Sequence, residues 1–266
     1  MDLGIRGKRA LLLASSSGLG YASAYALAKE GVDVCVSSSN AERAAAAAAA
    51  AATIADETGV KAVGLVGDLS DPANVAGLAK EAEDAMDGPF DILLNNHGGP
   101  PLRKAMEVTE AELTDHANKM LISLVGMTQL MIPGMVERKG GRLFMVGASA
   151  MAEPIPANVL SNMFRAAMAY YCKSLANDMI QDGVTVNIVS PTAILTGRTR
   201  YTAANFAEKK GIIREEELAL RESRLAAGRF GKPEEFGAMV AYLSGRSASY
   251  NTGANWRVDG GGVKSI

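Results

Sequence analysis

The sequence predicts an α/β protein built as one doubly wound parallel sheet with helices on both faces. Short apolar runs alternate with longer helical stretches along the chain, and this alternation is typical of parallel βαβ units. The length of 266 residues suits one such domain, since α/β folds often reach about 250 residues as a single unit. No linker rich in Pro, Gly or Ser divides the sequence, so we expect a single domain over residues 1–266.

The strands of this sheet are expected at seven short apolar runs. They are Ala10–Ala14, Asp33–Val36, Ala62–Val66, Ile92–Asn95, Arg142–Val146, Val184–Val189 and Asn255–Val258. Because helices separate them, we expect parallel neighbours joined by right-handed crossovers.

The stretches between the strands predict the helices. They are Ser17–Glu30, a helix through the alanine run Ala44–Ala52, about Pro72–Met86, Leu113–Val136, Val159–Gln181 and Pro233–Leu243. Polyalanine forms helix readily and is only weakly apolar, so we interpret that run as helix filler.

One long charged stretch, Gly197–Gly228, has helical composition and little strand character. In this architecture it lies at the carboxyl edge of the sheet, where ligands bind. We therefore expect a substrate lid at about residues 197–228, with a merely solvated excursion as the alternative.

Composition narrows the function classes. The net charge of −2 argues against a protein that binds nucleic acid or an anionic membrane surface. No run of about 18 apolar residues is present, so we expect no membrane span. Cys35 and Cys172 form no CxxC pair, which favours a reducing, cytoplasmic location, and the two histidines, His97 and His116, make a multi-histidine metal site unexpected.

The turn after the first strand predicts a nucleotide site. It reads Ala14-Ser15-Ser16-Ser17-Gly18-Leu19-Gly20 and opens the first βαβ unit. Small residues allow the backbone to approach a pyrophosphate, and the helix N-terminus that follows offers free N–H groups and the positive end of its dipole.

Further motifs follow in order. They are Gly67-Asp68-Leu69, Asn95-Asn96-His97-Gly98, Asn187 with Pro191-Thr192-Ala193-Ile194-Leu195-Thr196, Arg229-Phe230-Gly231-Lys232-Pro233-Glu234-Glu235, and Val258-Asp259-Gly260-Gly261. With these motifs the whole chain resembles the short-chain dehydrogenase/reductases, especially the branch of 3-oxoacyl-carrier-protein reductases. Gly18 and Gly20 match the last two glycines of the family's TGxxxGxG motif, although Leu13 and Ala14 replace its Thr and first Gly. Asn95–Gly98 resembles the NNAG motif, with His97 in place of Ala.

The resemblance implies a Rossmann-type fold, an NAD(P)-dependent oxidoreductase acting on a small-molecule substrate, and a homotetramer formed through the two long helices and the C-terminal segment. It also implies the positions that contact the cofactor. These are Ala14, Ser16, Ser17, Gly18, Leu19, Gly20, Ser38, Ser39, Asn40, Asp68, Leu69, Asn95, Gly98, Arg165, Pro191, Ile194 and Thr196.

The end of the second strand bears on cofactor choice. An acid there would bind the 2′-OH of NAD and repel the phosphate of NADP, but the chain reads Ser37-Ser38-Ser39-Asn40. These hydroxyls can donate to a 2′-phosphate, and Arg43 is the nearest basic residue. We expect NADP, with NAD as the alternative.

The catalytic positions of the family carry other residues in this chain. The resemblance implies a Tyr, a Lys four residues later, a Ser about 13 residues before the Tyr, and an Asn on the preceding helix. Counting from the flanking motifs places Ser161 at the Tyr position and Arg165 at the Lys position. Ala148 falls at the Ser position with Ser149 one residue later, and Met120 falls at the Asn position.

Tyr170 and Tyr171 do not restore the missing phenol. Neither lies four residues before Lys173, and neither shares the helix face of Ser161 and Arg165. We expect both tyrosines to be packing residues.

Several residues remain candidates for the chemistry. Arg165 can hold the nicotinamide ribose or a substrate carboxylate through its fork of donors. His97 can donate a proton, since an unperturbed histidine titrates near pH 6.5, although a packing role is the alternative. Glu153 either faces substrate or is a solvated loop charge, and His116, on a helix with charged neighbours, is expected to have no special role.

Three function classes remain open from the sequence. The first is an NADP-dependent oxidoreductase in which Ser149, Ser161 or His97 relays the proton. The second is a non-redox enzyme, such as a lyase or dehydratase, with Arg165 as an anion holder and His97 as a base. The third is a cofactor-binding protein without catalysis.

Overall fold

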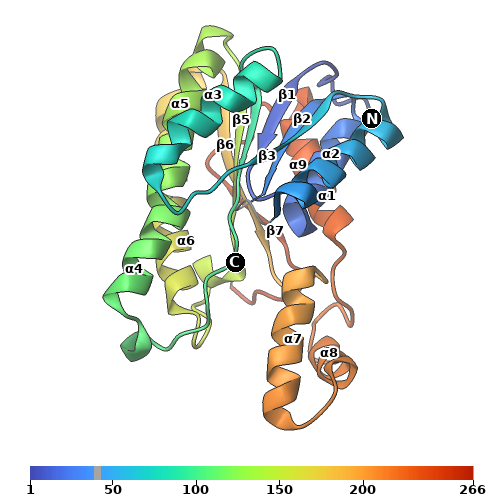
Figure 1. Cartoon of the computed structure of the whole chain (residues 1–266), viewed down its shortest axis with the longest axis vertical. Helices are drawn as coiled ribbons and strands as arrows, with labels where there is room; N and C mark the ends of the chain where they lie inside the picture. The colour runs from blue at the N-terminus through green and yellow to red at the C-terminus, as the bar shows by residue number, and fades with distance from the viewer. Residues whose placement is uncertain (39–42, 266) are drawn as a thin grey trace.

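The computed structural model describes residues 1–38 and 43–265 and contains the predicted doubly wound sheet (Figure 1). Its parallel strands follow the order β3-β2-β1-β4-β5-β6-β7, so the strand order reverses between β1 and β4. The strands are β1(Arg9–Leu12), β2(Asp33–Ser38), β3(Ala62–Val66), β4(Ile92–Asn95), β5(Gly141–Val146), β6(Val184–Pro191) and β7(Asn255–Val258). The expected strands are confirmed, with ends that shift by at most two residues.

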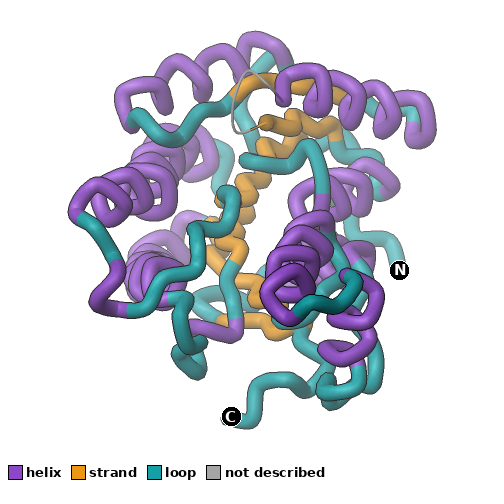
Figure 2. Tube along the Cα trace, turned by 60° about the horizontal axis from the view of Figure 1, so that its bottom comes forward, coloured by secondary structure: helices purple, strands orange, loops and turns teal. Residues whose placement is uncertain are grey.

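Helices cover both faces of the sheet, as Figure 2 shows from below. One layer holds α1(Gly18–Lys29), α2(Ala44–Thr58) and α9(Pro233–Ser244), and the other holds α3(Val75–Ala85), α5(Ser123–Glu137) and α6(Val159–Met179). Alternation along the strands divides the core between these layers, because successive side chains point to opposite faces. Leu12 and Leu94 pack under the first layer, whereas Leu11 and Leu93 pack under the second.

The long helix expected at 113–136 starts earlier and is not uniform. It comprises α4(Glu110–Ala117), the π-helical turn η4(Asn118–Ile122) and α5. Thr109 begins it with a capping box, in which the Thr109 hydroxyl accepts the amide of Glu112 at 3.2 Å. The helix expected at 72–86 likewise begins with a short 3₁₀ turn, η2(Pro72–Asn74), before α3.

The stretch Glu110–Glu137 bears on the expectation that the chain has no membrane-spanning segment. Among the described residues, Glu110–Glu137 is the segment long and apolar enough, by length and composition, to cross a membrane. Its inner face packs in the core beside the sheet through Leu124, Met127, Met131 and Met135. A core helix of a globular protein has this character, and we interpret the segment as one.

The charged stretch after β6 folds into two helices, α7(Gly197–Lys210) and α8(Arg214–Glu222). Figure 1 shows the pair projecting from the body of the protein, below the sheet. Glu217 on α8 is 3% exposed and joins the two helices through Lys210 Nζ of α7 at 2.6 Å. Arg221 Nε, on α8 itself, donates to the same carboxylate at 2.8 Å. Within residues 1–38 and 43–265, no group of three or more His, Cys, Asp or Glu is arranged to hold a metal ion.

Candidate active site

The loop between β1 and α1 forms a cradle of backbone. Gly18 has φ of +62°, and a Cβ on Gly20 would lie 2.6 Å from Ser15 Cα, so both positions require glycine. The first turn of α1 leaves amide groups without intrahelical partners, and these can donate to phosphate oxygens. Ala14 also has a positive φ of +46°, in the left-handed region that disfavours a side chain, at the position where the family has its first glycine.

The serines near this loop have different surroundings. The Ser15 hydroxyl is buried and donates to the Leu12 carbonyl at 2.6 Å, and the Ser37 hydroxyl accepts the Ala14 amide at 3.1 Å. Ser16 and Ser17 remain accessible beside the cradle.

The expected 2′-phosphate contacts at the end of β2 are only partly described. Ser38 is fully buried, and its hydroxyl donates toward the Leu65 carbonyl at 3.5 Å. This hydrogen bond directs the Ser38 hydroxyl toward β3, and its contact with a 2′-phosphate stays a prediction. Ser39 and Asn40 lie outside the described residues.

The loops after β4 and β3 complete the nucleotide side; β4 lies next to β1, whereas β3 is the edge strand beyond β2. The Asn96 amide donates to the Ala14 carbonyl at 3.1 Å and ties the loop after β4 to the cradle. Asn95 is buried and donates to Thr128 Oγ1 at 2.7 Å, so its side chain fixes the strand end. Asp68 after β3 is exposed, and hydrogen bonds from Ser70 lower the pKa of its carboxyl group, which keeps it ionised. Leu69 beside it is buried.

The segment after β6 faces the cradle from the other side. Leu195 and Ala193 exchange backbone hydrogen bonds with Gly231 at 2.9 Å, and Ile194 between them is 4% exposed. Thr196 accepts the Thr199 amide at 3.3 Å and thereby caps α7.

Thr196 also marks how close the two sides come. A Cβ built on Gly18 would lie 3.8 Å from Thr196 Cβ, so the cradle and the base of α7 lie opposite each other. A dinucleotide fits this arrangement, since the glycine cradle leaves room for its pyrophosphate and the residues from Pro191 to Thr196 line the adjoining edge.

Ser161 and Arg165 lie on one face of α6, as their spacing predicts. Arg165 Nε donates to Ser161 Oγ at 3.2 Å, and Arg165 Nη1 donates to the Val146 carbonyl at the end of β5. Both side chains are buried, with exposures of 5% for Ser161 and 9% for Arg165. Burial lowers the pKa of Arg165 to about 10, so the guanidinium remains a cation at neutral pH.

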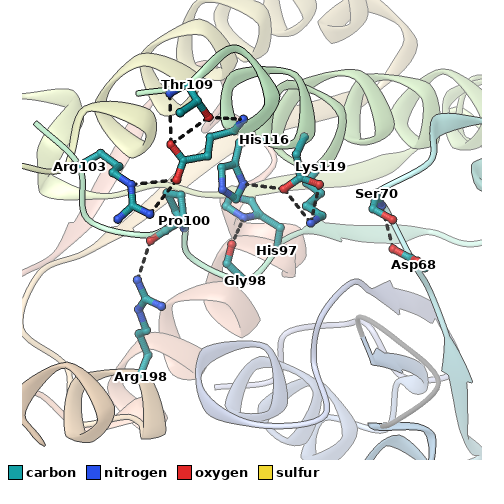
Figure 3. Close-up of polar contacts among 12 residues, drawn as sticks. Asp68, Ser70, His97, Gly98, Pro100, Arg103, Thr109, His116, Lys119 and Arg198 are labelled. Atoms are coloured by element: carbon teal, nitrogen blue, oxygen red, sulfur yellow. Dashed lines mark hydrogen bonds and ion pairs between the residues drawn. The ribbon is translucent and has the colours of Figure 1, made fainter. Parts of the chain in front are cut away.

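His97 is a buried, neutral imidazole. Its Nδ1 contacts the Gly98 carbonyl, and its Nε2 has no hydrogen-bond partner among the residues described (Figure 3). Burial, with the charge of Arg165, lowers the pKa of His97 to about 3. Burial and the charge of Arg165 disfavour the imidazolium, so His97 differs from the unperturbed histidine on which its candidate role as proton donor is based, and that role stays a prediction.

At the other family positions, Met120 and Ala148 offer no group for proton transfer, whereas Ser149 offers a hydroxyl one residue beyond Ala148. Met120 is fully buried in η4 and packs against Leu160 and Phe164. Ser149 begins the 3₁₀ turn η5(Ser149–Met151) after β5 and is half-buried, so its hydroxyl lies near the carboxyl edge of the sheet. Ala148 before it carries no polar group.

The structure also shows the surroundings of Tyr170, Tyr171 and Glu153. Tyr171 is half-buried and packs on the core, whereas Tyr170 is 79% exposed and makes no such packing within the chain. Glu153 accepts the amides of Lys264 and Ser265 at 3.2 Å, so it holds the C-terminal segment and is not directed at a substrate.

His116 is partly buried beside Asp115, with Nδ1 3.6 Å from that carboxylate. Figure 3 places its ring close to that of His97, and burial lowers its pKa as well.

A cavity of about 430 Å³ lies between the loop after β4 and α7. Arg198 lines this cavity, and its Nη2 donates to the Pro100 carbonyl at 2.7 Å. This hydrogen bond links α7 to the loop that carries His97 (Figure 3). The lining residues are Gly99, Pro101, Leu102, Arg103, Arg198, Tyr201, Thr202, Asn205, Phe206 and Lys209. Volume and position suit a small organic molecule.

Comparison with known proteins agrees with this geometry. The model of a family described as enoyl-(acyl carrier protein) reductase matches residues 13–262. The chain belongs to this family of short-chain dehydrogenase/reductases. Its members are NAD(P)-dependent oxidoreductases.

Named relatives extend over the whole chain. The 3-oxoacyl-acyl-carrier-protein reductase of Escherichia coli is 30% identical over 261 residues, which are 97% of this chain and 98% of that protein. The corresponding reductase of Aquifex aeolicus is 29% identical over 264 residues, 98% of this chain and 99% of that protein. The L-sorbose reductase of Gluconobacter frateurii, solved with NADPH and L-sorbose, has a TM-score of 0.93 and 28% identity, with 100% of both chains covered.

Proposed function

We propose that this protein is an NADP(H)-dependent oxidoreductase that interconverts a carbonyl and an alcohol, with Ser161 and Arg165 in place of the family's Tyr and Lys. The observation that carries the proposal is the cradle of Gly18 and Gly20 facing Thr196 across the carboxyl edge of the sheet. The reductase names of the relatives, and the NADPH bound to the L-sorbose reductase, support it.

The roles of the residues follow from their positions. The nicotinamide, when bound, supplies or takes up the hydride. Ser161 and Ser149 are the hydroxyls at the carboxyl edge that can hold the substrate oxygen. Arg165 orients Ser161 through their hydrogen bond.

The choice of NADP rests on charge. The end of β2 carries no acid that would repel a 2′-phosphate, and Arg43 at the start of α2 is the nearest cation. The two free cysteines, Cys35 and Cys172, are buried, which suits the cytoplasmic location that we propose.

The first test is a fluorescence titration of the protein with NADPH and with NADH, followed by a panel of carbonyl compounds. We expect tighter binding of NADPH and a loss of its absorbance on addition of a substrate. Binding without oxidation of the cofactor by any ketone, aldehyde or imine would contradict the proposal. Turnover that persists after the cofactor is removed would instead favour a non-redox enzyme.

The second test replaces the divergent pair together, as Ser161→Tyr with Arg165→Lys. A positioned proton donor contributes about 10²–10⁴-fold, so we expect the double variant to gain at least about a hundredfold on a generic ketone. Each single variant is the matched control and should gain much less, because the phenol and the ammonium act together. No gain in the double variant would show that other parts of the site are incompetent, which favours a cofactor-binding protein without catalysis.

A further inference from the structure

Arg165 is a buried cation without a counter-charge. Its two hydrogen-bond partners, the Ser161 hydroxyl and the Val146 carbonyl, are both neutral. No Asp or Glu in the described part of the chain forms an ion pair with it. A buried charge is costly unless it is paired, so this site lacks a negative group that completes it.

The guanidinium has donors to spare. Of its five N–H groups, Nε–H and one Nη1–H are used, and the other Nη1–H and both Nη2–H groups have no partner within residues 1–38 and 43–265. Nη2 is unpaired but is not fully enclosed by protein atoms, so a ligand can reach it. Donors on both terminal nitrogens match the two oxygens of one carboxylate.

A second unsatisfied group lies at the same edge of the sheet. His97 is 8% exposed, and its Nε2 is buried without a partner in the described residues. Asn95 pairs with Met145 in the β4–β5 register, so His97 and the Val146 carbonyl that holds Arg165 both follow this pair at the ends of neighbouring strands. The ring's Nδ1 contacts the Gly98 carbonyl and carries the proton, which leaves Nε2 as an acceptor.

We propose that the substrate is a small organic acid, held at two points: its carboxylate on Arg165, and the hydroxyl of its alcohol form on His97 Nε2. This inference rests on the proposed function and names its substrate class. The two groups are complementary, since an anion and a hydroxyl donor satisfy both unpaired groups at once.

The cofactor alone does not supply this anion. Its phosphates are expected at the N-terminus of α1, which follows β1, whereas Arg165 is fixed to the end of β5. With β4 between them, these strands are about 10 Å apart at 4.8 Å per strand. The hydroxyls of a ribose are neutral and leave the charge uncompensated.

The cavity beside the loop that carries His97 is also lined by cations. The lining of the 430 Å³ cavity includes Arg103, Arg198 and Lys209 and contains no acid. Glu112 neutralises Arg103 at 2.8 Å, whereas Arg198 donates to a backbone carbonyl. A cleft lined by one sign of charge raises the local concentration of an oppositely charged substrate.

The test compares acids with their neutral amides. Pyruvate, acetoacetate and levulinate are each paired with the corresponding amide, and both binding to the NADP-loaded protein and kcat/KM with NADPH are measured. We expect at least one acid to be favoured over its amide by at least about tenfold, since charged hydrogen bonds are roughly twice as strong as neutral ones. Equal values for each acid and its amide would overturn the inference.

Matched variants locate the effect. In Arg165→Met we expect the acid preference to fall to near one, while Arg142→Met retains it. Arg142 is a control because it is a half-buried arginine of the same strand region, at the opposite end of β5, bonded to the Gly141 carbonyl. Arg165→Lys keeps the positive charge but loses the planar pair of donor nitrogens, so we expect it to retain part of the acid preference. This variant replaces Arg165→Met in the test if the Met variant fails to fold. A preference that survives in both Arg165 variants would overturn the inference.

The His97 contact is tested with a hydroxy acid and its O-methyl ether. The wild-type protein should bind the hydroxy acid more tightly, and His97→Phe should bind the two equally. The failures can be told apart. Acids that bind through Arg165 without any turnover would leave this inference standing and refute the oxidoreductase. Turnover of neutral ketones as fast as that of keto acids would refute this inference and leave the proposed oxidoreductase standing.

Discussion

His97 combines a titratable ring with a buried, cationic environment, and this gives the protein a pH-dependent stability. Its folded pKa is about 3, against 6.5 when unperturbed. Between these values the unfolded chain binds a proton that the folded chain does not, so stability falls as the pH drops below 6.5. At pH 5 the loss from this one group is about 2 kcal/mol, at 1.36 kcal/mol per unit.

The measurement is urea unfolding of the wild type and of His97→Gln at pH 7 and pH 5. Relative to the variant, the wild type should lose about 2 kcal/mol between the two values. His116→Gln is the comparison, and a smaller difference is expected because His116 is more exposed and Asp115 opposes the shift. Parallel losses in the wild type and His97→Gln would show that His97 titrates normally.

The sequence located some of these residues well and others badly, for a physical reason. Counting along the sequence predicts the pairing of Ser161 and Arg165, because residues four positions apart on a helix lie on the same face. The environments of Ser38 and Glu153 depend on the Leu65 carbonyl and on the amides of Lys264 and Ser265, which are distant in the sequence. The low pKa of His97 likewise depends on its burial and, second, on the charge of Arg165, which is 68 positions away.

Glu217 holds the helix pair α7–α8 together. Its carboxylate is almost fully buried between Lys210 and Arg221. Replacing it as Glu217→Gln removes the charge that both cations share. A broken buried pair costs about 3–5 kcal/mol, and because Lys210 and Arg221 are partly exposed we expect about 1–3 kcal/mol, confined to the pair.

Limited proteolysis and hydrogen exchange of residues 197–228 would measure this change. The variant should be cleaved and exchanged faster there, while Glu216→Gln, an exposed neighbour, should behave as the wild type. Hydrogen bonds from Lys210 and Arg221 lower the pKa of Glu217. Its contribution is therefore present above the unfolded value of about 4.3 and is lost as the pH falls through the lower folded value. Equal protection in both variants would show that other contacts hold the pair.

Elements were easier to predict than their irregularities. The strands follow from short apolar runs, since buried strands need apolar residues on both faces. The π-helical turn η4 was not foreseen, because Asn118–Ile122 reads as ordinary helix and the shift in hydrogen bonding depends on packing around Met120. That turn lies where the family has its Asn, so the irregular backbone and the altered residue coincide.

At the scale of the whole molecule, apolar side chains fill the core on each face of the sheet, but several large apolar side chains are exposed at the surface. Four of the exposed large apolar residues lie on η4, α5 and α6, and these elements belong to the same layer of Figure 1. They are Ile122, Leu130, Met163 and Tyr170. Ile122 and Leu130 are eight residues apart, and Met163 and Tyr170 seven, so each pair shares a helix face. Patches of this kind mark protein–protein contacts.

We therefore expect these faces to be covered by further copies of the chain in a homotetramer, with a mass by light scattering near four times 27.7 kDa. Leu130→Glu with Tyr170→Glu places charges in that contact and should yield smaller species of unchanged secondary structure. Met106→Glu is the control, since Met106 is 97% exposed on the turn η3(Ala105–Glu107), outside both helices, and should leave the mass unchanged. A monomeric mass for the wild type would contradict the tetramer, and the exposed side chains of both helices would then need another partner.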